Sequence, residues 1–298
     1  MSIGPDAPLT GLRVAITRSR DRAGALADAL AAAGAEPVLV PLIDFETAPD
    51  AGALDAALAR LAAGEYQWLV VSSITTVRAL KQWCAGHSTT LAELVPAATK
   101  VATIGPSSRR ILEAEGLAVE LAPVDVQSAD GLVALWPAGS GRVLLPHSNL
   151  AEPGLESGIA SAGFDVDAVD AYVTVDYPAA EGRRLTAVLA PSAAWTVQPQ
   201  NAPQSASSDP AEHILITPAE AAAEVRSGAI NAVVAASSSA AQRIHALLAP
   251  LPASCQLIVI GQPTRAESVR LGMHVAETAT HPTPAGIVDA LVRARRNP

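Results

Sequence analysis

Short apolar runs alternate with amphipathic stretches along most of this chain. The clearest example is the Leu-Ile-Val-Ile run at 257–260, whose apolar and mostly β-branched residues are typical of a buried strand. Gly261 and Pro263 interrupt the run, and a helical pattern then extends from Thr264 to Gly272. The same alternation recurs along the chain and predicts parallel sheets with helices on both faces.

A glycine turn follows two of the predicted strands and opens a helix each time. Gly105 comes directly after the strand at 101–104, and Gly261 comes directly after the strand at 257–260. Such turns direct free backbone N–H groups, and the positive end of the helix dipole, toward the space beyond the sheet. Two such turns in matching surroundings predict a duplicated architecture with an anion-binding face.

Two kinds of unit each occur twice in the sequence. A short unit of strand, helix and strand spans 11–42, and its pattern recurs from Arg142, with Gly34 and Gly163 at matching positions. The order along the chain is short, long, short, long, and one unit of each kind supplies a full doubly wound sheet. The long unit contributes strands at 68–71, 101–104 and 119–121 in its first copy, and at 232–235 and 257–260 in its second.

The repeat leaves open which short unit pairs with which long unit. Tandem domains would divide near 139–141, whereas interleaved domains would send the chain across near 42–47 and again near 171–177. Residues 188–210 break the pattern, because proline, glutamine and serine dominate them, and we predict a flexible surface insertion there. Trp195 within this insertion is either an incidental loop residue or packs against a domain.

Composition and charge exclude several classes of partner. The 298 residues carry a formal net charge of -9, so we expect neither nucleic acid nor an anionic membrane surface as a partner. Apolar runs stay far short of the ~20 residues that a membrane span needs, and the N-terminus lacks the pattern of a signal peptide. We therefore expect a cytoplasmic protein with Cys84 and Cys255 as reduced packing residues. The histidines do not fall at ligand spacing, so no metal site is expected.

Hydroxyl-bearing residues gather where the predicted strands end, and ligands of parallel sheets bind beyond those ends. The sequence has no nucleophile elbow and no glycine-rich phosphate loop, so backbone donors and hydroxyls are the expected ligand contacts. The serines and threonines equally fit a simpler role as helix caps. The residues that we expect to contact a ligand are Arg18, Ser72, Ser73, Thr75, Gly105, Ser107, Ser108, His147, Ser237, Ser238, Ser239, Gly261, Gln262 and Thr264.

Three residues carry more specific expectations. Arg18 lies just past a strand end, where a guanidinium could hold a carboxylate through two hydrogen bonds, although a solvated arginine also fits. His147 has the matching place in the second short unit and is either a hydrogen-bond donor or a surface residue. Tyr172 lies in the second predicted connector, where a phenol could donate a proton to a ligand or simply pack against a domain.

The order and spacing of these motifs resemble the uroporphyrinogen-III synthase family. The likeness covers nearly the whole chain apart from the first residues and the insertion. The chain departs from the family at 71–73 and 235–237, where Phe-Thr-Ser is common, and near Pro146 and His147, where an arginine–glycine pair is common. The motifs that carry the likeness are 14–18 (Val-Ala-Ile-Thr-Arg), the turn from Ser72 to Val77, Ile104-Gly105 with Ser108, 171–174 (Ala-Tyr-Val-Thr), 237–240 (Ser-Ser-Ser-Ala), Ile260-Gly261 with Thr264, and 282–284 (Pro-Thr-Pro) with Leu291.

The resemblance implies a fold and an activity. The fold would be α/β, with two flavodoxin-like doubly wound parallel-sheet domains that are interleaved in the chain and joined by a two-stranded connector. The first domain would comprise 1–44 and 175–298, including the insertion, and the second would comprise 45–174. The activity would be that of a lyase of haem and cobalamin biosynthesis. It would close hydroxymethylbilane to uroporphyrinogen III in an interdomain cleft, with loss of water and inversion of the last pyrrole ring.

The resemblance also implies roles for single residues. Tyr172 matches the family's cleft tyrosine and would be catalytic, Thr264 matches its threonine after the glycine turn, and Ser73 and Ser237 match its strand-end serines. No cofactor would be needed. We expect a monomer that binds the linear tetrapyrrole substrate, and a transient contact with the preceding pathway enzyme.

Two other classes of protein are also built from α/β domains of this kind. A non-catalytic receptor for a small metabolite could be built from two hinged α/β domains, but export signals and aromatic sugar platforms are missing from the sequence. A flavodoxin-like electron carrier would need a phosphate loop for its flavin, and the sequence has none.

Overall fold

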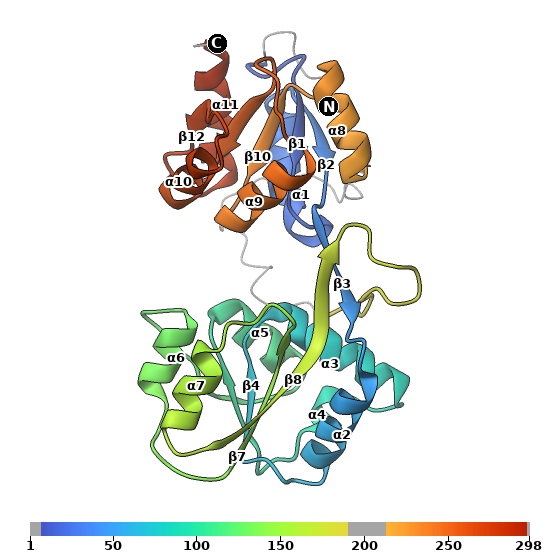
Figure 1. Cartoon of the computed structure of the whole chain (residues 1–298), viewed down its shortest axis with the longest axis vertical. Helices are drawn as coiled ribbons and strands as arrows, with labels where there is room; N and C mark the ends of the chain where they lie inside the picture. The colour runs from blue at the N-terminus through green and yellow to red at the C-terminus, as the bar shows by residue number, and fades with distance from the viewer. Residues whose placement is uncertain (1–6, 190–212, 297–298) are drawn as a thin grey trace, which may run out of the picture. The chain divides into compact units, whose positions relative to one another are not determined.

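The computed structural model describes residues 7–189 and 213–296, without the side chains of 20–22. This part of the chain divides into two compact units (Figure 1). Unit 1 contains the described residues up to 44, those at 176–178 and those from 213 onward, and unit 2 contains 45–175 and 179–189. Trp195 and most of the predicted insertion lie outside the described residues.

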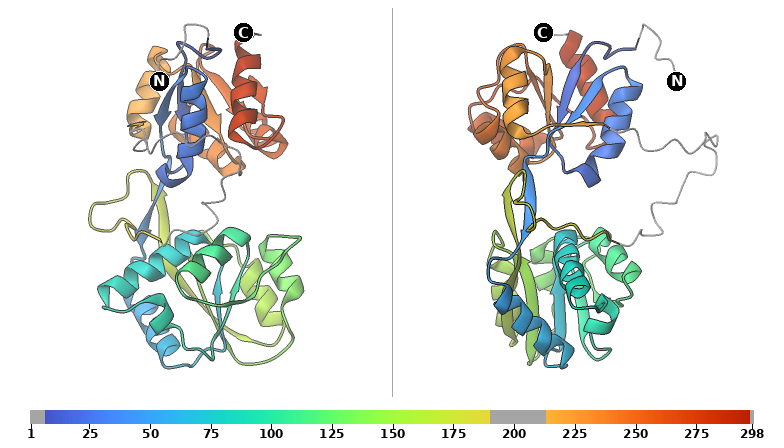
Figure 2. Two further views of the ribbon diagram at one scale, coloured as in Figure 1. Left: turned by 180° about the vertical axis from the view of Figure 1, so that it is seen from behind. Right: turned by 90° about the vertical axis from the view of Figure 1, so that its right-hand side faces the viewer.

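Unit 1 is a parallel sheet with the strand order β12-β11-β10-β1-β2-β9. Helices α1 and α11 cover one face and α8 and α9 the other (Figure 2, right panel). The strands are β1 (Arg13–Ile16), β2 (Glu36–Leu39), β9 (Ile214–Leu215), β10 (Ala232–Ala235), β11 (Gln256–Val259) and β12 (Glu277–Thr278). The helices are α1 (Arg20–Ala32), α8 (Pro218–Ser227), α9 (Ser238–Leu247), α10 (Gln262–Arg270) and α11 (Pro284–Arg296).

Unit 2 repeats this design with the strand order β3-β8-β7-β4-β5-β6. Helices α2, α3 and α4 pack on one face of its sheet, and α6 and α7 on the other. The strands are β3 (Ile43–Thr47), β4 (Trp68–Val71), β5 (Lys100–Thr103), β6 (Val119–Leu121), β7 (Arg142–Ser148) and β8 (Asp165–Asp176). The helices are α2 (Ala51–Ala62), α3 (Ile74–Gly86), α4 (Leu91–Leu94), α5 (Pro106–Ala114), α6 (Ala129–Leu135) and α7 (Gly154–Ser161).

Strand pairing decides between the two arrangements that the repeat left open. The first short unit (β1, β2) pairs with the last long unit through β10, and the second short unit (β7, β8) pairs with the first long unit through β4. The tandem alternative is therefore wrong, and the interleaved doubly wound fold is confirmed. The matching orders β2-β1-β10-β11-β12 and β8-β7-β4-β5-β6 place a topological switch point between β1 and β10 and between β7 and β4.

Local signals explain why the two short units match. Gly34 and Gly163 follow α1 and α7, and both adopt a positive φ, of 91° and 102°. Only glycine adopts this left-handed conformation readily, so each ends its helix and turns the chain into the next strand. The helices dock because one face is apolar: Leu26 and Leu30 of α1 are buried in the core of unit 1. Full burial of such a side chain stabilises the fold by about 1.5–3 kcal/mol.

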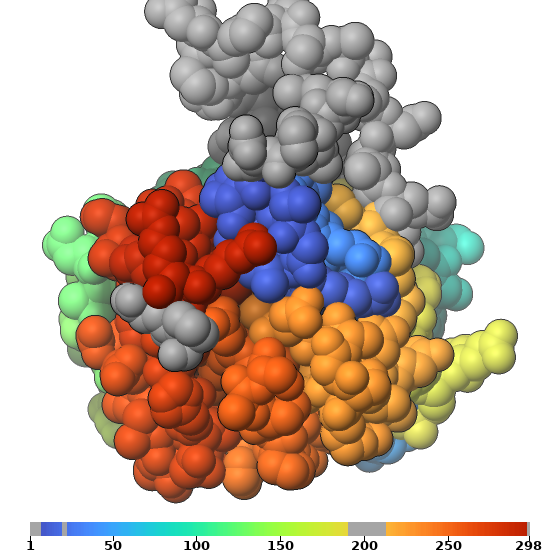
Figure 3. Space-filling model, turned by 90° about the horizontal axis from the view of Figure 1, so that it is seen from above, coloured from blue at the N-terminus to red at the C-terminus, as the bar shows by residue number. Residues whose placement is uncertain are grey.

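The two ends of unit 1 meet on its surface. In Figure 3 the last helix, in dark red, lies beside the first described residues, in blue. Arg295 joins them, because its Nη1 donates to the backbone oxygens of Pro8 (2.9 Å) and Thr10 (3.0 Å). This contact completes a unit whose parts come from opposite ends of the sequence.

Two predicted boundaries differ from the structure. The strand expected at 166–169 and the connector expected at 171–177 form one continuous strand, β8, which pairs with β3. Residues 179–189, expected in the first domain, belong to unit 2. Backbone pairing explains this difference: the Leu185 N–H donates to the Phe45 carbonyl at 2.9 Å, and the Leu185 side chain enters the core of unit 2.

The predicted cysteines lie in separate cores. Cys84 is buried in unit 2 and Cys255 in unit 1, and both are free thiols. Burial raises the pKa of Cys84 to about 11 and that of Cys255 to about 12, so both stay protonated and unreactive at neutral pH.

An ion-pair cluster closes the amino-terminal end of the sheet in unit 2. Asp167 accepts hydrogen bonds from the buried Tyr66 hydroxyl and from Arg60 Nη2 (2.6 Å), while Arg142 lies over the Tyr66 ring. Burial by itself raises the pKa of the Asp167 carboxyl, but the hydrogen bonds from Tyr66 and Arg60 and the nearby guanidinium charges hold it below its usual value. A lowered carboxyl pKa means that the ionised form stabilises the fold.

We therefore expect Asp167→Asn to lower the free energy of unfolding by about 1–2 kcal/mol at pH 7. The folded-state pKa lies below the unfolded one, so this stabilisation is present above about pH 4 and disappears as the pH falls through the folded-state value. Urea titrations at pH 7 and at about pH 3 measure the difference. Asp165→Asn is the control, because the Asp165 side chain is 78% exposed and 3.6 Å from Arg142. Equal losses for both variants at both pH values would contradict the prediction.

Candidate functional site

The switch point of unit 2 gathers several predicted residues in one turn. Ser72 and Ser73 follow β4, and Ser73 caps α3 by accepting a hydrogen bond at Oγ from the backbone N–H of Thr76 (3.0 Å). Ser72 and Thr75 are half-buried in the same turn. Ser73 therefore has the helix-capping role that the sequence left open, and a role of this turn in ligand binding stays a prediction.

A β-bulge turns Tyr172 toward the face of the sheet that α3 covers. His147 pairs with Asp170, but the next residue, Ser148, pairs with Tyr172, so Ala171 is an extra residue on β8. Because side chains alternate along a strand, Tyr172 would otherwise point to the same face as Asp170. Instead, Ala171 and Tyr172 both belong to the core beneath α3. Bulges re-aim side chains in this way beside functional sites.

Tyr172 meets Ser73 across the end of β7. The two hydroxyl oxygens are 3.2 Å apart, although the residues are 99 positions apart in the chain. The Tyr172 ring packs edge-on against Phe45, with ring centroids 5.7 Å apart, and the residue is only 6% exposed. The structure therefore brings the predicted acid and a predicted strand-end serine into one hydrogen-bonded group.

His147 lies apart from that group. By strand alternation it shares a face with Val143 and Leu145, whose side chains pack under α6 and α7. Its Nδ1 donates to the Ser148 backbone oxygen (2.9 Å) and lies 3.3 Å from Asp170 Oδ1. These contacts fix the ring so that Nε2 is the nitrogen left for any ligand. A role in ligand binding remains a prediction.

The neighbouring turn of unit 2 follows β5. Gly105 is the N-cap of α5, and Ser107 and Ser108 occupy its first turn. Ser108 is buried, whereas Ser107 is exposed and its Oγ accepts from Arg110 Nη2 (3.4 Å). Hence only Ser108 of the two is enclosed in the fold, and Ser107 is free to face solvent.

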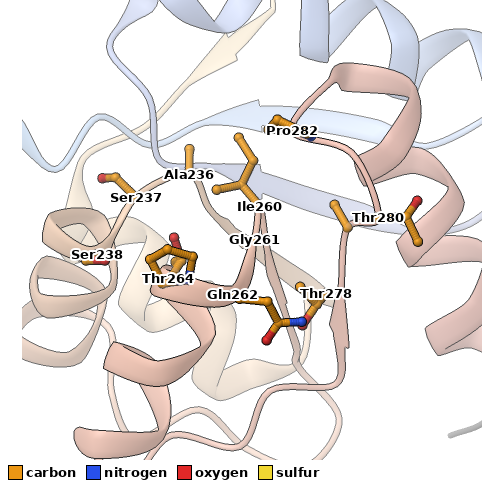
Figure 4. A pocket seen from close by; sticks show the side chains of 12 residues that line it. Ala236, Ser237, Ser238, Ile260, Gly261, Gln262, Thr264, Thr278, Thr280 and Pro282 are labelled. Carbon is orange, nitrogen blue, oxygen red and sulfur yellow. The ribbon is translucent and has the colours of Figure 1, made fainter. Parts of the chain in front are cut away.

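Unit 1 carries a pocket of about 620 Å³ at the matching strand ends (Figure 4). Its wall comes from the residues after β10, the first turn of α10, and the loop after β12. Ser237 caps α9 through the Ala240 N–H (3.1 Å) and lies 3.0 Å from Ser239 Oγ, so it repeats the role of Ser73. The lining residues are Ala236, Ser237, Ser238, Ile260, Gly261, Gln262, Pro263, Thr264, Thr278, Ala279, Thr280 and Pro282.

Arg18 lies at the same edge of unit 1. It follows β1 by two positions and is half-buried. The adjacent Thr17 is buried, and its hydroxyl donates to the backbone oxygen of Val234 in β10 (2.8 Å). This hydrogen bond holds the end of β1 against β10, at the switch point of unit 1. Because Arg18 is the next residue, it lies at the edge of the sheet where a ligand is expected.

The two turn glycines are not required by the fold itself. Gly105 (φ −141°) and Gly261 (φ −179°) have extended backbones that any residue adopts. Among the described residues, a Cβ at Gly105 would meet nothing within 4 Å, and one at Gly261 would only touch Pro263 at 3.9 Å. Ser108 and Thr264 are both buried three positions beyond these glycines. Pro106 and Pro263 have no N–H, so the helix-start donors that no side chain caps are those of Ser107 and Ser108 in α5 and of Gln262 and Thr264 in α10, which suits a ligand that approaches the backbone.

The sequence did not predict the wall of the pocket that comes from β12 and the loop after it. Thr278 and Thr280 come from β12 and the loop after it, and β12 is too short to give a strand pattern. The repeat contained the missing signal, because 119–121 of the first long unit already marked a strand at the matching place. Gly131 and Gly286 match as well: each backbone N–H donates to the hydroxyl that caps its helix, at 3.2 Å from Ser128 and 3.1 Å from Thr283.

Other classes of site find no support in the described residues. They contain no group of three or more His, Cys, Asp or Glu side chains that could hold a metal ion. Nor does any helix in the described ranges have the length and apolar character to cross a membrane. In the described ranges the strand ends carry hydroxyls, helix-start N–H groups and cationic side chains such as Arg18 and Arg265, the latter donating to Thr278 Oγ1 at 3.3 Å. Such groups bind anionic or hydrogen-bonding ligands.

This architecture defines a class: an interleaved two-domain α/β protein whose strand ends carry amide and hydroxyl donors. The family model described as uroporphyrinogen-III synthase HemD matches residues 24–289. The chain therefore belongs to the uroporphyrinogen-III synthase family, as the resemblance indicated.

Curated relatives match shorter stretches. Uroporphyrinogen-III synthase of Synechococcus elongatus is 28% identical over 142 residues, which are 47% of this chain and 52% of that protein. The porphyrin biosynthesis protein HemD of Ruminiclostridium josui is 29% identical over 116 residues, 39% of this chain and 22% of that protein. The matches thus span about half the length of the first relative and about a fifth of the second.

Solved structures show the same fold. A mutant uroporphyrinogen III synthase from the extremely thermophilic bacterium Thermus thermophilus aligns with a TM-score of 0.58 at 17% identity, covering 97% of this chain and 100% of that chain. Uroporphyrinogen-III synthetase from Helicobacter pylori aligns with a TM-score of 0.52 at 11% identity, covering 95% and 99%. At these identities the likeness concerns the fold alone.

The glycines of unit 1 give a test of the site geometry. We expect Gly261→Ala to leave the midpoint of thermal unfolding within about 2 °C of the parent, because the backbone is extended and the space is open. Gly286→Ala should lower it by several degrees, because the new methyl group would collide with the His281 backbone oxygen in the pocket loop. Thermal unfolding followed by circular dichroism measures both, and similar losses would show that Gly261 has a packing role.

Proposed function

We propose that this protein is a uroporphyrinogen-III synthase that closes hydroxymethylbilane to uroporphyrinogen III. The observation that carries the proposal is the Tyr172–Ser73 hydroxyl pair at the switch point of unit 2. A phenol that can release a proton lies there beside the start of helix α3. Membership of the family supports the proposal, since the relatives are named for this step of tetrapyrrole biosynthesis.

The donors at the strand ends suit the proposed substrate. A linear tetrapyrrole carries carboxylate side chains on every ring, yet this protein has a net charge of -9. Bulk attraction therefore cannot hold the substrate, because like charges repel at long range. Oriented N–H groups at the starts of α3, α5, α9 and α10, with Arg18, act at short range and are not cancelled by the overall charge.

The chemistry is mostly the substrate's own. A pyrrole nitrogen pushes its electron pair toward the terminal carbon, the carbon–oxygen bond breaks, and the hydroxyl leaves as water once it has received a proton. The resulting electrophile is attacked by the substituted carbon of the last pyrrole. The spiro intermediate then fragments and closes again with that ring inverted, and the proton lost as the ring regains its aromaticity balances the proton that left in water.

The protein's tasks are therefore positioning and proton supply. Holding the reacting carbons together favours closure at the substituted carbon over the spontaneous closure that leaves the ring uninverted. Tyr172 would supply the proton to the departing hydroxyl, as a general acid. Its ring is fixed by Phe45 and its oxygen by Ser73, so the phenol is held in one place.

The remaining expectations follow from this activity and stay proposals. The reaction needs no cofactor, because it involves no change in oxidation state. A monomer suffices for it, with at most a transient contact to the enzyme that makes hydroxymethylbilane. The cytoplasm, where that substrate would be made, is the expected location.

The isomer ratio of the product tests the proposed function. Hydroxymethylbilane is supplied to the purified protein, the product is oxidised, and type I and type III porphyrins are separated by chromatography. We expect the type III isomer to dominate with the protein and the type I isomer to dominate in a buffer blank. A product ratio equal to that of the blank would contradict the proposal and favour a non-catalytic receptor.

Replacing Tyr172 tests the role of its hydroxyl. We expect Tyr172→Phe to lower the rate of type III formation by about ten- to a hundredfold, because general acids typically contribute factors of this size or larger. The ring still packs against Phe45, so the thermal midpoint should change little. Tyr66→Phe is the matched control: it removes a hydroxyl at the opposite end of the same sheet and should reduce stability without reducing kcat. Unchanged turnover of Tyr172→Phe would remove this residue from the mechanism.

A further inference from the structure

Thr76 is a buried polar residue behind the Tyr172–Ser73 pair. It lies in the first turn of α3 and is completely buried, so it cannot touch a ligand itself. Its Oγ1 is 2.9 Å from Ser73 Oγ, and its backbone N–H donates to the same atom at 3.0 Å. Ser73 Oγ, in turn, is 3.2 Å from the Tyr172 hydroxyl. Three hydroxyl groups therefore form a hydrogen-bonded series, with the half-buried Ser73 between the buried Thr76 and Tyr172.

The single hydroxyl proton of Ser73 allows two arrangements of donors and acceptors among the three hydroxyl groups. A hydroxyl has one proton to donate and two lone pairs that accept. The Thr76 N–H occupies one lone pair of Ser73, so of its two hydroxyl neighbours one must donate to Ser73 and the other must accept from it. In one arrangement Tyr172 donates to Ser73, and its proton points away from any ligand. In the other, Thr76 donates to Ser73 and Ser73 donates to Tyr172, whose own proton is then free to face a ligand.

We propose that the Thr76 hydroxyl is a positioning group that holds Ser73 as a donor to Tyr172, so that the phenol presents its proton to the substrate. The inference rests on the proposed function of Tyr172 as the acid. The hydrogen-bonded hydroxyl groups would also assist the proton transfer. When the Tyr172 phenol gives its proton to the departing hydroxyl, Ser73 already donates a hydrogen bond to the phenolate that is left. Without the Thr76 hydroxyl, Ser73 has an open lone pair, and Tyr172 fills it with the proton that it should deliver.

Isosteric variants test this role. We expect Thr76→Val to lower kcat for type III formation by about five- to tenfold, the factor that one hydrogen bond of about 1–1.4 kcal/mol represents. KM should stay within about twofold, because the residue touches no ligand. Thr76→Ser keeps the hydroxyl and should retain most of the parental kcat. Thr76→Ala offers the same comparison as Thr76→Val with no risk of overpacking, and thermal unfolding identifies any variant that fails to fold.

A double-mutant cycle with Tyr172→Phe separates positioning from a general loss of structure. If Thr76 acts through the Tyr172 hydroxyl, adding Thr76→Val to Tyr172→Phe should change kcat by less than about twofold, because the group that it positions is gone. The same fivefold loss in both backgrounds, or no loss in either, would overturn the inference and leave the proposed function standing. A parent protein that yields no excess of the type III isomer would overturn both.

Discussion

The parallel pairing of β1 with β10, and of β7 with β4, is the interaction on which each unit depends. Each pair joins a short unit to a long unit from a distant part of the chain. Because the strands run parallel, their carboxyl ends and the helices that follow open at one edge of each sheet. Loss of either pairing would separate the cores on both faces and scatter the donors gathered at that edge.

The same constraint determines the kind of chemistry that this edge supports. Hydroxyls and backbone N–H groups dominate there, and Ser73 and Ser237 have equivalent capping roles in the two units. Helix starts carry partial positive charge without adding to the net charge of the protein. An acidic chain can in this way present local sites for carboxylates. The chain that carries these groups belongs to the uroporphyrinogen-III synthase family.

Duplication also shows where the two units differ. Unit 2 has a bulge on β8 that brings Tyr172 against Ser73, and a buried Thr76 behind them. In unit 1 the residue at the place of Thr76 is Ala240, which offers Ser237 only its backbone N–H. At the matching edge, unit 1 has a pocket lined in part by Thr278 and Thr280. The repeated framework thus supplies matching helix starts, while the side chains added to each copy make the ends of the two sheets unlike.

The elements themselves could be predicted from the sequence, because they depend on local patterns. Apolar runs marked β4, β5, β10 and β11, glycines with positive φ ended the helices, and serines before helical stretches became caps. The repeat also limited the topology to two alternatives. Very short strands such as β12 gave no pattern, so the pocket side that they form was missed.

Only the tertiary structure decided which short unit pairs with which long unit, and where 179–189 packs. It also decided that Tyr172 points to the face of the sheet that carries Ser73, and not to the face that carries Asp170. The physical reason is that each of these depends on contacts between residues that are far apart in the chain. A strand pattern specifies two faces but no partner, and a bulge is defined only by the register between two paired strands. Local sequence therefore determined the donors, and strand pairing determined which of them meet.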